Sequence, residues 1–330
     1  MGDLRILFVD NMNPISASPF REVELIYLKK HLPNTHYFLY PNNFNISKNP
    51  ILFSKNFNLG FGVGLNPSFD YVRNIFERID LPFVFELYPG FGFFIDDSTS
   101  DAKLRYLFGH KLFKGVVITM PLTLKYVTEK NLVDKNKILF KYGGFIEMGN
   151  IVQRTPNKTP NIYFIAQVYG NQAGIYKGFD TFYEASKIYK NYNFIAFGGW
   201  QRPAQKNLKL FGSMPIKEII KLINIGDIFI SNNRWYGGQL DGFPTTCAVE
   251  AGLVGATLLL SDLGNNNVYL KDDVDFIKIE DSNALVKLGQ ILKNDALRIS
   301  MGLSGSRKIK EVFETNNQIR SRIDFYEKMI

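Results

Sequence analysis

Two short apolar runs in the second half of the chain limit how it can fold. Gly226–Ser231 and Ala256–Asp262 are both short and closed by turn residues, which is typical of buried strands. The residues between them form a loop with glycine and proline, followed by an apolar segment that is long enough for a short helix. A strand, a helix and a second strand in this order predict one repeat of a doubly wound α/β sheet.

The segment that begins this helix, DGFPTTCAVEAG, runs from Asp241 to Gly252. Thr245 or Thr246 is expected to cap the helix, because a hydroxyl oxygen can accept a hydrogen bond from a free N–H group of the first turn. Those N–H groups and the helix dipole also form a site suited to phosphate. Glu250 falls in the first turns. The residues alone leave open whether it binds a ligand or only complements the dipole on a solvated face.

The rest of the chain repeats this alternation in two halves. Strands are expected at 4–10, 36–40, 58–64, 81–94, 115–120, 136–144, 161–169, 193–200 and 208–215, and helices at 19–31, 69–79, 176–190, 216–226 and, in three segments, at 282–330. The polar stretch Gly149–Asn161 contains two prolines and reads as a linker between the halves. The pattern predicts two doubly wound α/β domains.

Composition excludes several classes of protein. The one cysteine, Cys247, rules out an internal disulfide framework and is expected to be a buried structural thiol. The three histidines are scattered without metal-ligand spacing. No apolar run reaches the roughly 18 residues of a membrane span, and the first ten residues do not resemble a secretory leader. A soluble, cytoplasmic protein is expected.

The net charge of +8 fits three kinds of partner: nucleic acid, an anionic membrane surface or phosphorylated substrates. Because no helix-turn-helix, zinc finger or RNA-binding strand motif is present, a nucleic-acid partner is not expected. The loop after the first strand, Asn11–Ser18, contains no glycine. A GxGxxG loop is required at this point in a Rossmann dinucleotide fold, so an NAD or FAD enzyme of that type is not expected either.

The segment GFPTTCAVEAGLVGATLLLSDLG, Gly242–Gly264, resembles the donor-binding segment of GT-B glycosyltransferases, especially the retaining family 4. This resemblance implies the GT-B fold, in which two Rossmann-like domains face a central cleft. It places an acceptor-side domain at 1–150, a nucleotide-sugar-binding domain at 151–315, and a C-terminal helix at 316–330 that returns to the first domain. It also implies that Glu250 hydrogen-bonds the ribose hydroxyls of the donor.

The resemblance extends to further donor-site positions. The family has two Glu separated by seven residues, whereas here Asp241 precedes Glu250 with eight residues between them. Lys177 occupies the position of a Lys that pairs with the donor diphosphate. Its partner Arg is replaced by Gln167 or a neighbour, and Arg202 or Arg234 could take its place. The full donor-binding set implied is Gln167, Lys177, Ser213, Met214, Asp241, Gly242, Phe243, Thr245, Thr246 and Glu250.

The first domain holds the expected acceptor and catalytic residues. In the family the loop after the first strand faces the acceptor, which implicates Asn11, Ser16 and Ser18. Glu86 and Tyr88 follow the strand that begins near Leu81, at the end where open α/β sheets bind ligands. They are the catalytic candidates, although the His that the family carries in this region is absent.

These observations predict a retaining glycosyltransferase. It would move a sugar from a nucleoside-diphosphate sugar to a glycan or lipid-linked acceptor, in cell-surface polysaccharide or glycoconjugate synthesis. No metal or cofactor is expected, because no Asp-x-Asp pair lies in a strand-end loop. Peripheral contact with an anionic inner membrane face is a further expectation. The alternatives are a catalytically silent GT-B subunit that binds glycan or a partner, and a UDP-sugar epimerase of the same fold.

Overall fold

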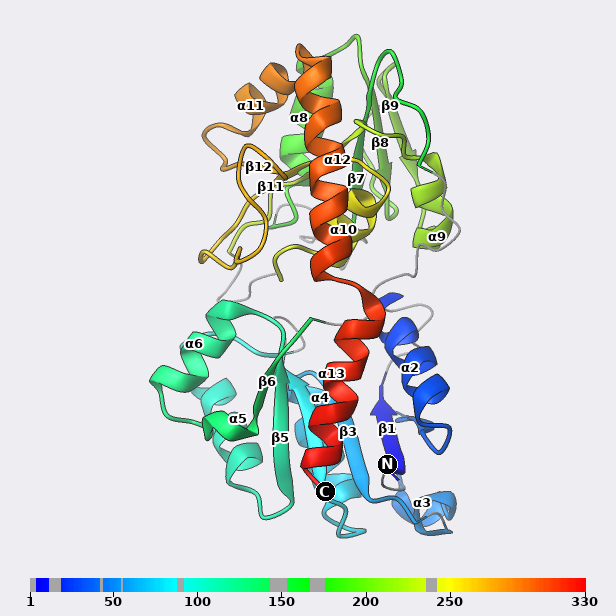
Figure 1. Ribbon diagram of the computed structural model, residues 1–330, viewed down its shortest axis with the longest axis vertical. Helices are drawn as coiled ribbons and strands as arrows, with labels where there is room; N and C mark the ends of the chain where they lie inside the picture. Colours follow the sequence, from blue (N-terminus) through cyan, green and yellow to red (C-terminus); the bar gives the residue numbers. More distant parts are fainter. Residues whose placement is uncertain are drawn as a thin grey trace. The chain divides into compact units, whose positions relative to one another are not determined.

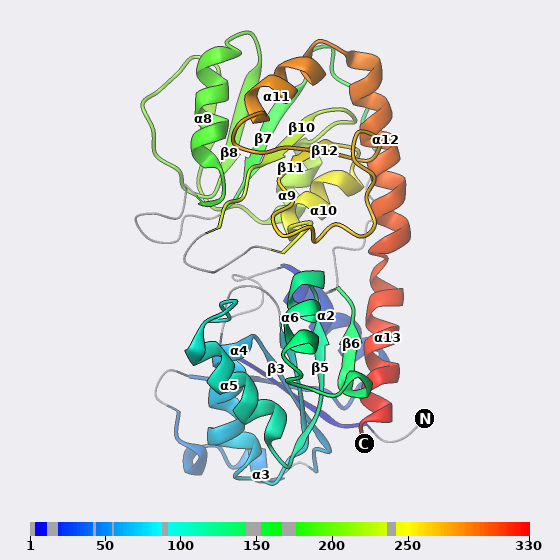
Figure 2. The same cartoon turned by 90° about the vertical axis from the view of Figure 1, so that its left-hand side faces the viewer.

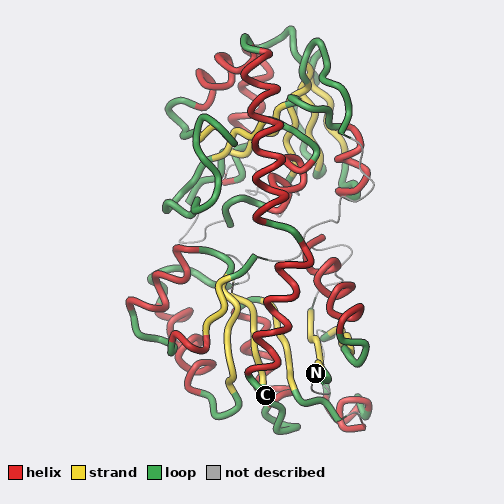
Figure 3. The backbone as a smooth tube through the Cα atoms, viewed as in Figure 1, coloured by secondary structure: helices red, strands yellow, loops and turns green. Residues whose placement is uncertain are grey.

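The computed structural model describes residues 4–11, 19–41, 44–54, 56–87, 92–142, 153–166, 176–235 and 242–330. Within these ranges the chain divides into two compact units. Unit 1 holds the described residues from 4 to 142, Gly242 and residues 315–330, and unit 2 holds those from 153 to 235 and from 243 to 314. Each unit is a sheet with helices around it (Figures 1 and 3).

The sheet of unit 1 has six parallel strands in the order β2-β1-β3-β4-β5-β6. Strands that are covered on both faces read as nearly continuous apolar runs. β1 and β4 show this pattern, because every residue of ILFVD and FVFEL is buried. The strands are β1 (Ile6–Asp10), β2 (His36–Leu39), β3 (Leu59–Val63), β4 (Phe83–Leu87), β5 (Phe113–Ile118) and β6 (Ile138–Phe140).

Helices cover both faces of this sheet. Figure 2 shows α4 and α5 on one side of β3 and β5 and α13 on the other, and α13 packs against α2. The helical segments are α2 (Pro19–His31), η1 (Ile46–Lys48), α3 (Ile51–Ser54), α4 (Leu65–Tyr71), the π-helical η2 (Val72–Phe76), α5 (Ser98–Gly109), α6 (Pro121–Glu129), η3 (Lys135–Lys137) and α13 (Thr315–Lys328).

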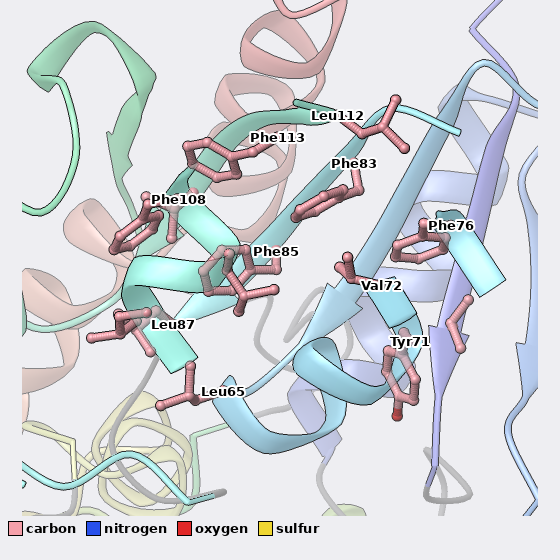
Figure 4. Packing of buried hydrophobic residues seen from close by; sticks show 14 of the residues in the cluster. Leu65, Tyr71, Val72, Phe76, Phe83, Phe85, Leu87, Phe108, Leu112 and Phe113 are labelled. Atoms are coloured by element: carbon pink, nitrogen blue, oxygen red, sulfur yellow. The ribbon is translucent and has the colours of Figure 1, made fainter. Parts of the chain in front are cut away.

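The alternation of β4 decides which side chains enter the aromatic core of unit 1. Phe83, Phe85 and Leu87 face the cluster that contains Phe76 and Phe108, as Figure 4 shows. The Phe83 ring stacks on Phe76 at 5.9 Å and the Phe85 ring on Phe108 at 5.7 Å, between centroids. Because successive side chains of a strand point to opposite faces, the residue between Phe85 and Leu87 is directed to the other face.

The sheet of unit 2 also has six parallel strands, in the order β12-β11-β10-β7-β8-β9. They are β7 (Asn161–Ile165), β8 (Asn193–Phe197), β9 (Leu208–Phe211), β10 (Ile228–Ser231), β11 (Thr257–Leu260) and β12 (Ile277–Lys278). All four residues of β10 and of β11 are buried, as expected for strands in the middle of a doubly covered sheet.

The helices of unit 2 lie on both sides of its sheet, with α8 and α12 on opposite sides in Figure 2. They are α8 (Phe179–Ile188), α9 (Ile216–Ile219), η4 (Ile220–Leu222), α10 (Thr246–Leu253), α11 (Ala284–Leu292) and α12 (Asp295–Val312). α12 packs on α10 and β11. This approach is so close that a Cβ atom on Gly302 would collide with the Gly255 carbonyl oxygen.

The structure confirms the doubly wound α/β architecture predicted for both halves. Three of the expected helices have different bounds. The helix expected at 69–79 is α4 followed by η2 and begins earlier, at Leu65, the one expected at 176–190 is α8 at Phe179–Ile188, and the one expected at 216–226 ends at Leu222. One expectation about a side chain needs correction. Cys247 was expected to be buried, but it is only half-buried, since it lies on the first turn of α10, before the part of that helix that is fully covered.

Candidate functional site in unit 2

The strand order of unit 2 contains a topological switch point between β7 and β10. The chain proceeds from β7 to β8 and β9 on one side, and from β10 to β11 and β12 on the other. Open α/β sheets bind ligands at such a point, beyond the carboxyl ends of the strands. The connection after β7 leads to Lys177 and α8, and the connection after β10 leads to Glu250 on α10.

The start of α10 has the cap that the sequence predicts. Thr245 is the N-cap in extended conformation, and its hydroxyl oxygen accepts a hydrogen bond from the Ala248 amide at 3.4 Å. Thr246 is the first helical residue and is half-buried. A cap satisfies one of the free N–H groups of the first turn, and the others remain available to an anion.

Glu250 is a buried carboxylate on this helix. It is fully buried, and neither carboxylate oxygen has a hydrogen-bond partner among the residues that the structure describes. Burial raises the pKa of its carboxyl group well above the ordinary value, and the positive charge of Lys217 offsets this shift in part. An acidic group without a hydrogen bond is costly to bury. A buried polar group in this state calls for a partner such as an ordered water, an ion or a ligand.

The start of α8 lies against the segment that follows β10. Gly178 is the N-cap in left-handed conformation and makes no side-chain cap, and a Cβ atom on it would lie 2.5 Å from the Asn232 carbonyl oxygen. Only glycine therefore fits at this contact. The preceding Lys177 is half-buried, with its Nζ atom 5.2 Å from the centroid of the Tyr176 ring. A cation and the N-terminus of a helix are thus placed side by side, which favours an anion there.

The two arginines considered for the diphosphate have different surroundings. The Arg202 guanidinium lies over the rings of Phe179 and Tyr183, at 5.5 and 5.7 Å. Arg234 is ion-paired with Asp180 on α8 and with Asp281, both at 2.7 Å. The sequence alone points to neither acid, because each is far from Arg234 along the chain and no local pattern signals the pairing.

The other predicted donor-site residues are placed as follows. Ser213 and Met214 are exposed, between β9 and α9. Phe243 is buried and packs edge-on against Phe276 at 5.5 Å. Gly242 is half-buried. Gln167 and Asp241 lie outside the described residues. The roles assigned to this set stay predictions.

In unit 1 the catalytic candidate Glu86 lies in a buried ion-pair cluster. The Arg322 guanidinium of α13 donates to Glu24 at 2.6 Å, to Glu86 at 3.0 Å and to the Tyr142 carbonyl oxygen at 2.9 Å. Glu24, Glu86 and Arg322 are fully buried. These contacts hold α13 against the sheet, so they give Glu86 a structural role, and its catalytic role stays a prediction.

The remaining predicted residues of unit 1 are less informative. Asn11 is exposed and follows the carboxyl end of β1, next to the buried ion pair between Asp10 and Arg21 at 2.9 Å. Ser16, Ser18 and Tyr88 lie outside the described residues. The acceptor-side and catalytic roles of all four therefore stay predictions.

Metal-ligating clusters and membrane-spanning helices are both absent from the described part of the chain. No group of three or more His, Cys, Asp or Glu side chains within it is arranged to hold a metal ion. No helix within it has the length and apolar character needed to cross a membrane.

No protein-family model matches this sequence, and no curated protein matches it either. Solved structures do match over nearly the whole chain. A sucrose-phosphate synthase from Thermosynechococcus elongatus matches with a TM-score of 0.75 and 10% identity, over 99% of each chain. HepE from Anabaena, in complex with UDP-glucose, matches with a TM-score of 0.68 and 12% identity, over 97% of this chain and 99% of that one.

An alpha-glucosyltransferase in complex with UDP-glucose and DNA containing an abasic site also matches, with a TM-score of 0.63 and 8% identity. The match covers 98% of this chain and 99% of that one. At such low identities these likenesses establish the fold and nothing finer. The fold is the GT-B fold of glycosyltransferases, which confirms the resemblance of Gly242–Gly264 at the level of fold.

Proposed function

We propose that this protein is a glycosyltransferase that moves a sugar from a nucleoside-diphosphate sugar to a glycan or lipid-linked acceptor. The observation that carries the proposal is Glu250. It is a fully buried carboxylate whose oxygens have no partner in the described part of the chain, on the helix that follows a central strand at the switch point of a Rossmann-like sheet. Ribose hydroxyls would supply the hydrogen-bond donors that these oxygens lack.

The diphosphate of the donor would bind between the N-termini of α8 and α10. The first-turn amides of both helices favour an anion, and Lys177 adds a positive charge directly before α8. Ser213 and Met214 would contact the nucleobase through their backbone atoms. The wider donor set, which includes Gly242, Phe243, Thr245 and Thr246, belongs to the same proposal.

The reaction would proceed with retention at the anomeric carbon. The bond from that carbon to the diphosphate oxygen breaks, a bond to the acceptor oxygen forms on the same face, and the acceptor proton passes to the leaving phosphate. The contribution of the protein is then mainly electrostatic, because it neutralises the leaving group and holds two substrates in place. No metal takes part in this proposal, and no cofactor is needed.

The acceptor substrate would bind to unit 1. Asn11, Ser16 and Ser18 follow β1, which lies beside β3 at the switch point of that sheet. The net charge of +8 suits an acceptor carried at an anionic membrane surface, as in cell-surface polysaccharide synthesis. The same charge also suits DNA, which one protein of this fold binds, so the acceptor test includes it.

The test is incubation with a panel of UDP-, GDP-, ADP- and TDP-sugars, with lipid-linked glycan, soluble glycan or duplex DNA as acceptor. Nucleoside diphosphate released together with a glycosylated acceptor supports the proposal, and the acceptor that reacts identifies the substrate class. Binding of a nucleotide without any release would instead indicate a silent GT-B subunit. A changed sugar without any acceptor would indicate an epimerase.

A further inference from the structure

The first turn of α8 carries a carboxylate at a place where the proposed function requires an anion to bind. Asp180 is the second residue of this helix. A carboxylate in the first turn interacts favourably with the positive end of the helix dipole. It would therefore compete with a phosphate for the same amides, and it would repel that phosphate by like charge. The adjacent cation Lys177 would be drawn to such a carboxylate in the same way.

The structure shows how the negative charge of Asp180 is compensated. Nη1 of Arg234 donates to both Asp180 oxygens, at 2.7 and 2.8 Å. Nε of the same guanidinium donates to both oxygens of Asp281, at 2.7 and 2.9 Å. One arginine therefore binds two carboxylates, each with two contacts, and this paired geometry is specific to the planar guanidinium. We call Arg234, Asp180 and Asp281 the Arg234 clamp.

Further hydrogen bonds fix the orientation of the clamp. Nη2 of Arg234 donates to the Thr181 hydroxyl at 3.1 Å, and its backbone amide donates to the Tyr176 carbonyl oxygen at 2.7 Å. The Asn232 amide group donates to Thr181 at 3.0 Å and to Asp281 at 2.6 Å. Arg234 also lowers the pKa of the Asp281 carboxyl group, chiefly through its hydrogen bonds. Both partners are thus held in place as a charged pair.

The clamp joins three connections that leave the same edge of the sheet. Asp180 follows β7, Arg234 follows β10 and Asp281 follows β12, and all three strands are parallel. The carboxyl ends of these strands meet at the edge where a ligand binds. The clamp therefore lies beside the site proposed for the diphosphate and belongs to unit 2 alone.

We propose that Arg234 is a positioning residue that compensates the carboxylate in the first turn of α8, so that the donor diphosphate can bind at this helix end. The inference rests on the proposed function. It differs from a direct role of Arg234 on phosphate, because here the guanidinium acts through Asp180. The two roles predict different results for a double variant.

The experiment is calorimetric titration of UDP and GDP into wild type, Arg234→Ala, Asp180→Asn and the double variant. Loss of Arg234 leaves Asp180 uncompensated, so we expect about tenfold weaker binding of the preferred nucleotide. Removing the carboxylate in the double variant should restore most of that loss. Lys187→Ala is the matched control, since Lys187 is an exposed lysine of α8 paired with Glu184 at 2.6 Å. It should bind as wild type does.

Several outcomes would overturn the inference. Binding by Arg234→Ala that is as tight as that of wild type would contradict it. So would a double variant that binds no better than Arg234→Ala, which would indicate direct contact between Arg234 and phosphate. If Arg234→Ala does not fold, the Asp180→Asn variant alone tests the inference. If Arg234 acts by compensating Asp180, Asp180→Asn should bind the nucleotide at least as tightly as wild type does, and weaker binding by this variant would contradict the inference. A wild-type protein that binds no nucleoside diphosphate refutes the proposed function itself, which is a distinct result.

Discussion

Lys177 should contribute more to turnover than to nucleotide binding. The negative charge on the leaving diphosphate grows in the transition state, and a cation beside it stabilises that state more than the bound donor. Lys177→Ala should therefore reduce kcat by about a hundredfold, while UDP affinity falls by less than about tenfold. Steady-state kinetics and UDP titration of the same preparation measure both quantities, with Lys187→Ala as the control. An equal loss of affinity and of kcat would refute this role.

Glu250 should couple nucleotide binding to proton release. Burial raises the pKa of its carboxyl group in the ligand-free site, whereas hydrogen bonds from ribose hydroxyls favour the ionised form. A ligand that prefers the ionised form binds more tightly as pH rises towards the pKa of the free protein. Titrations in buffers of different ionisation enthalpy should therefore detect proton release, which Glu250→Gln abolishes. Proton uptake on binding, or the same release from the Gln variant, would contradict this.

The amino-acid pattern predicted the cap of α10 but not the contacts around Arg234. Thr245 or Thr246 was expected to cap this helix, and the structure shows that the cap is Thr245. The Arg234 clamp was not predictable, because Arg234 is separated from Asp180 and Asp281 by 54 and 47 residues. Only the fold brings these side chains together. Gln167 and Asp241 lie outside the described residues.

At the scale of elements, short apolar runs closed by turn residues predicted the strands well, because a doubly covered sheet leaves little room for polar positions. The helix that contains Pro67 shows the limit of this approach. It was expected to begin at Phe69, yet α4 begins at Leu65. Proline is tolerated there because the first N–H groups of a helix have no intrahelical partner. Asp97, which the sequence analysis does not single out, caps α5 by accepting a hydrogen bond from the Ser100 amide at 2.7 Å.

The attachment of α13 to unit 1 should depend on pH through Glu24. The pKa of Glu24 is raised to about 8, and burial is the largest cause. Glu86 also raises this pKa, while Arg322 and Arg21 lower it. Because this pKa exceeds its ordinary value of 4.5, the unfolded chain releases the proton first. Glu24 therefore makes the folded state lose stability as pH rises from about 4.5 to about 8.

Glu24→Gln removes this titration and retains an oxygen that can accept from Arg322. The melting temperature of Glu24→Gln minus that of wild type should increase steadily between pH 5 and pH 8. Melting curves across this range test the difference, and Glu129→Gln is the control, since Glu129 is an exposed residue paired with Lys125 at 3.8 Å. Parallel curves for wild type and Glu24→Gln would show that Glu24 does not titrate in this window.

At the scale of the whole molecule, the fold is retained where sequence similarity is almost lost. Structures only 8–12% identical to the chain cover nearly all of it, while no family model matches. The sequence pattern predicted this fold because a doubly wound sheet requires only buried strands, amphipathic helices and turns in the right order. It could not predict how Glu86 and Arg322 pair, since they are separated by 236 residues.

Sugar transfer by this protein should not require a divalent metal. The proposed site neutralises the diphosphate with Lys177 and helix N-termini, so a metal has no necessary part in it. Turnover of the preferred nucleotide-sugar should be the same, within error, after treatment with EDTA and after addition of manganese or magnesium. Activity that is lost in EDTA and recovered with manganese would contradict this part of the proposal.

Calorimetric titration of nucleoside diphosphates into wild type and Glu250→Ala tests whether Glu250 lies in a nucleotide-sugar site. Each charge-assisted hydrogen bond to ribose contributes about 1.5–3 kcal/mol. Glu250→Ala should therefore bind the preferred nucleotide roughly one to two orders of magnitude more weakly. Its melting temperature should not fall below that of wild type by more than a few degrees. Glu311→Ala, at an exposed residue of α12 paired with Lys308, should bind as wild type does. If Glu250→Ala binds every nucleotide as tightly as wild type, the donor site does not lie at Glu250.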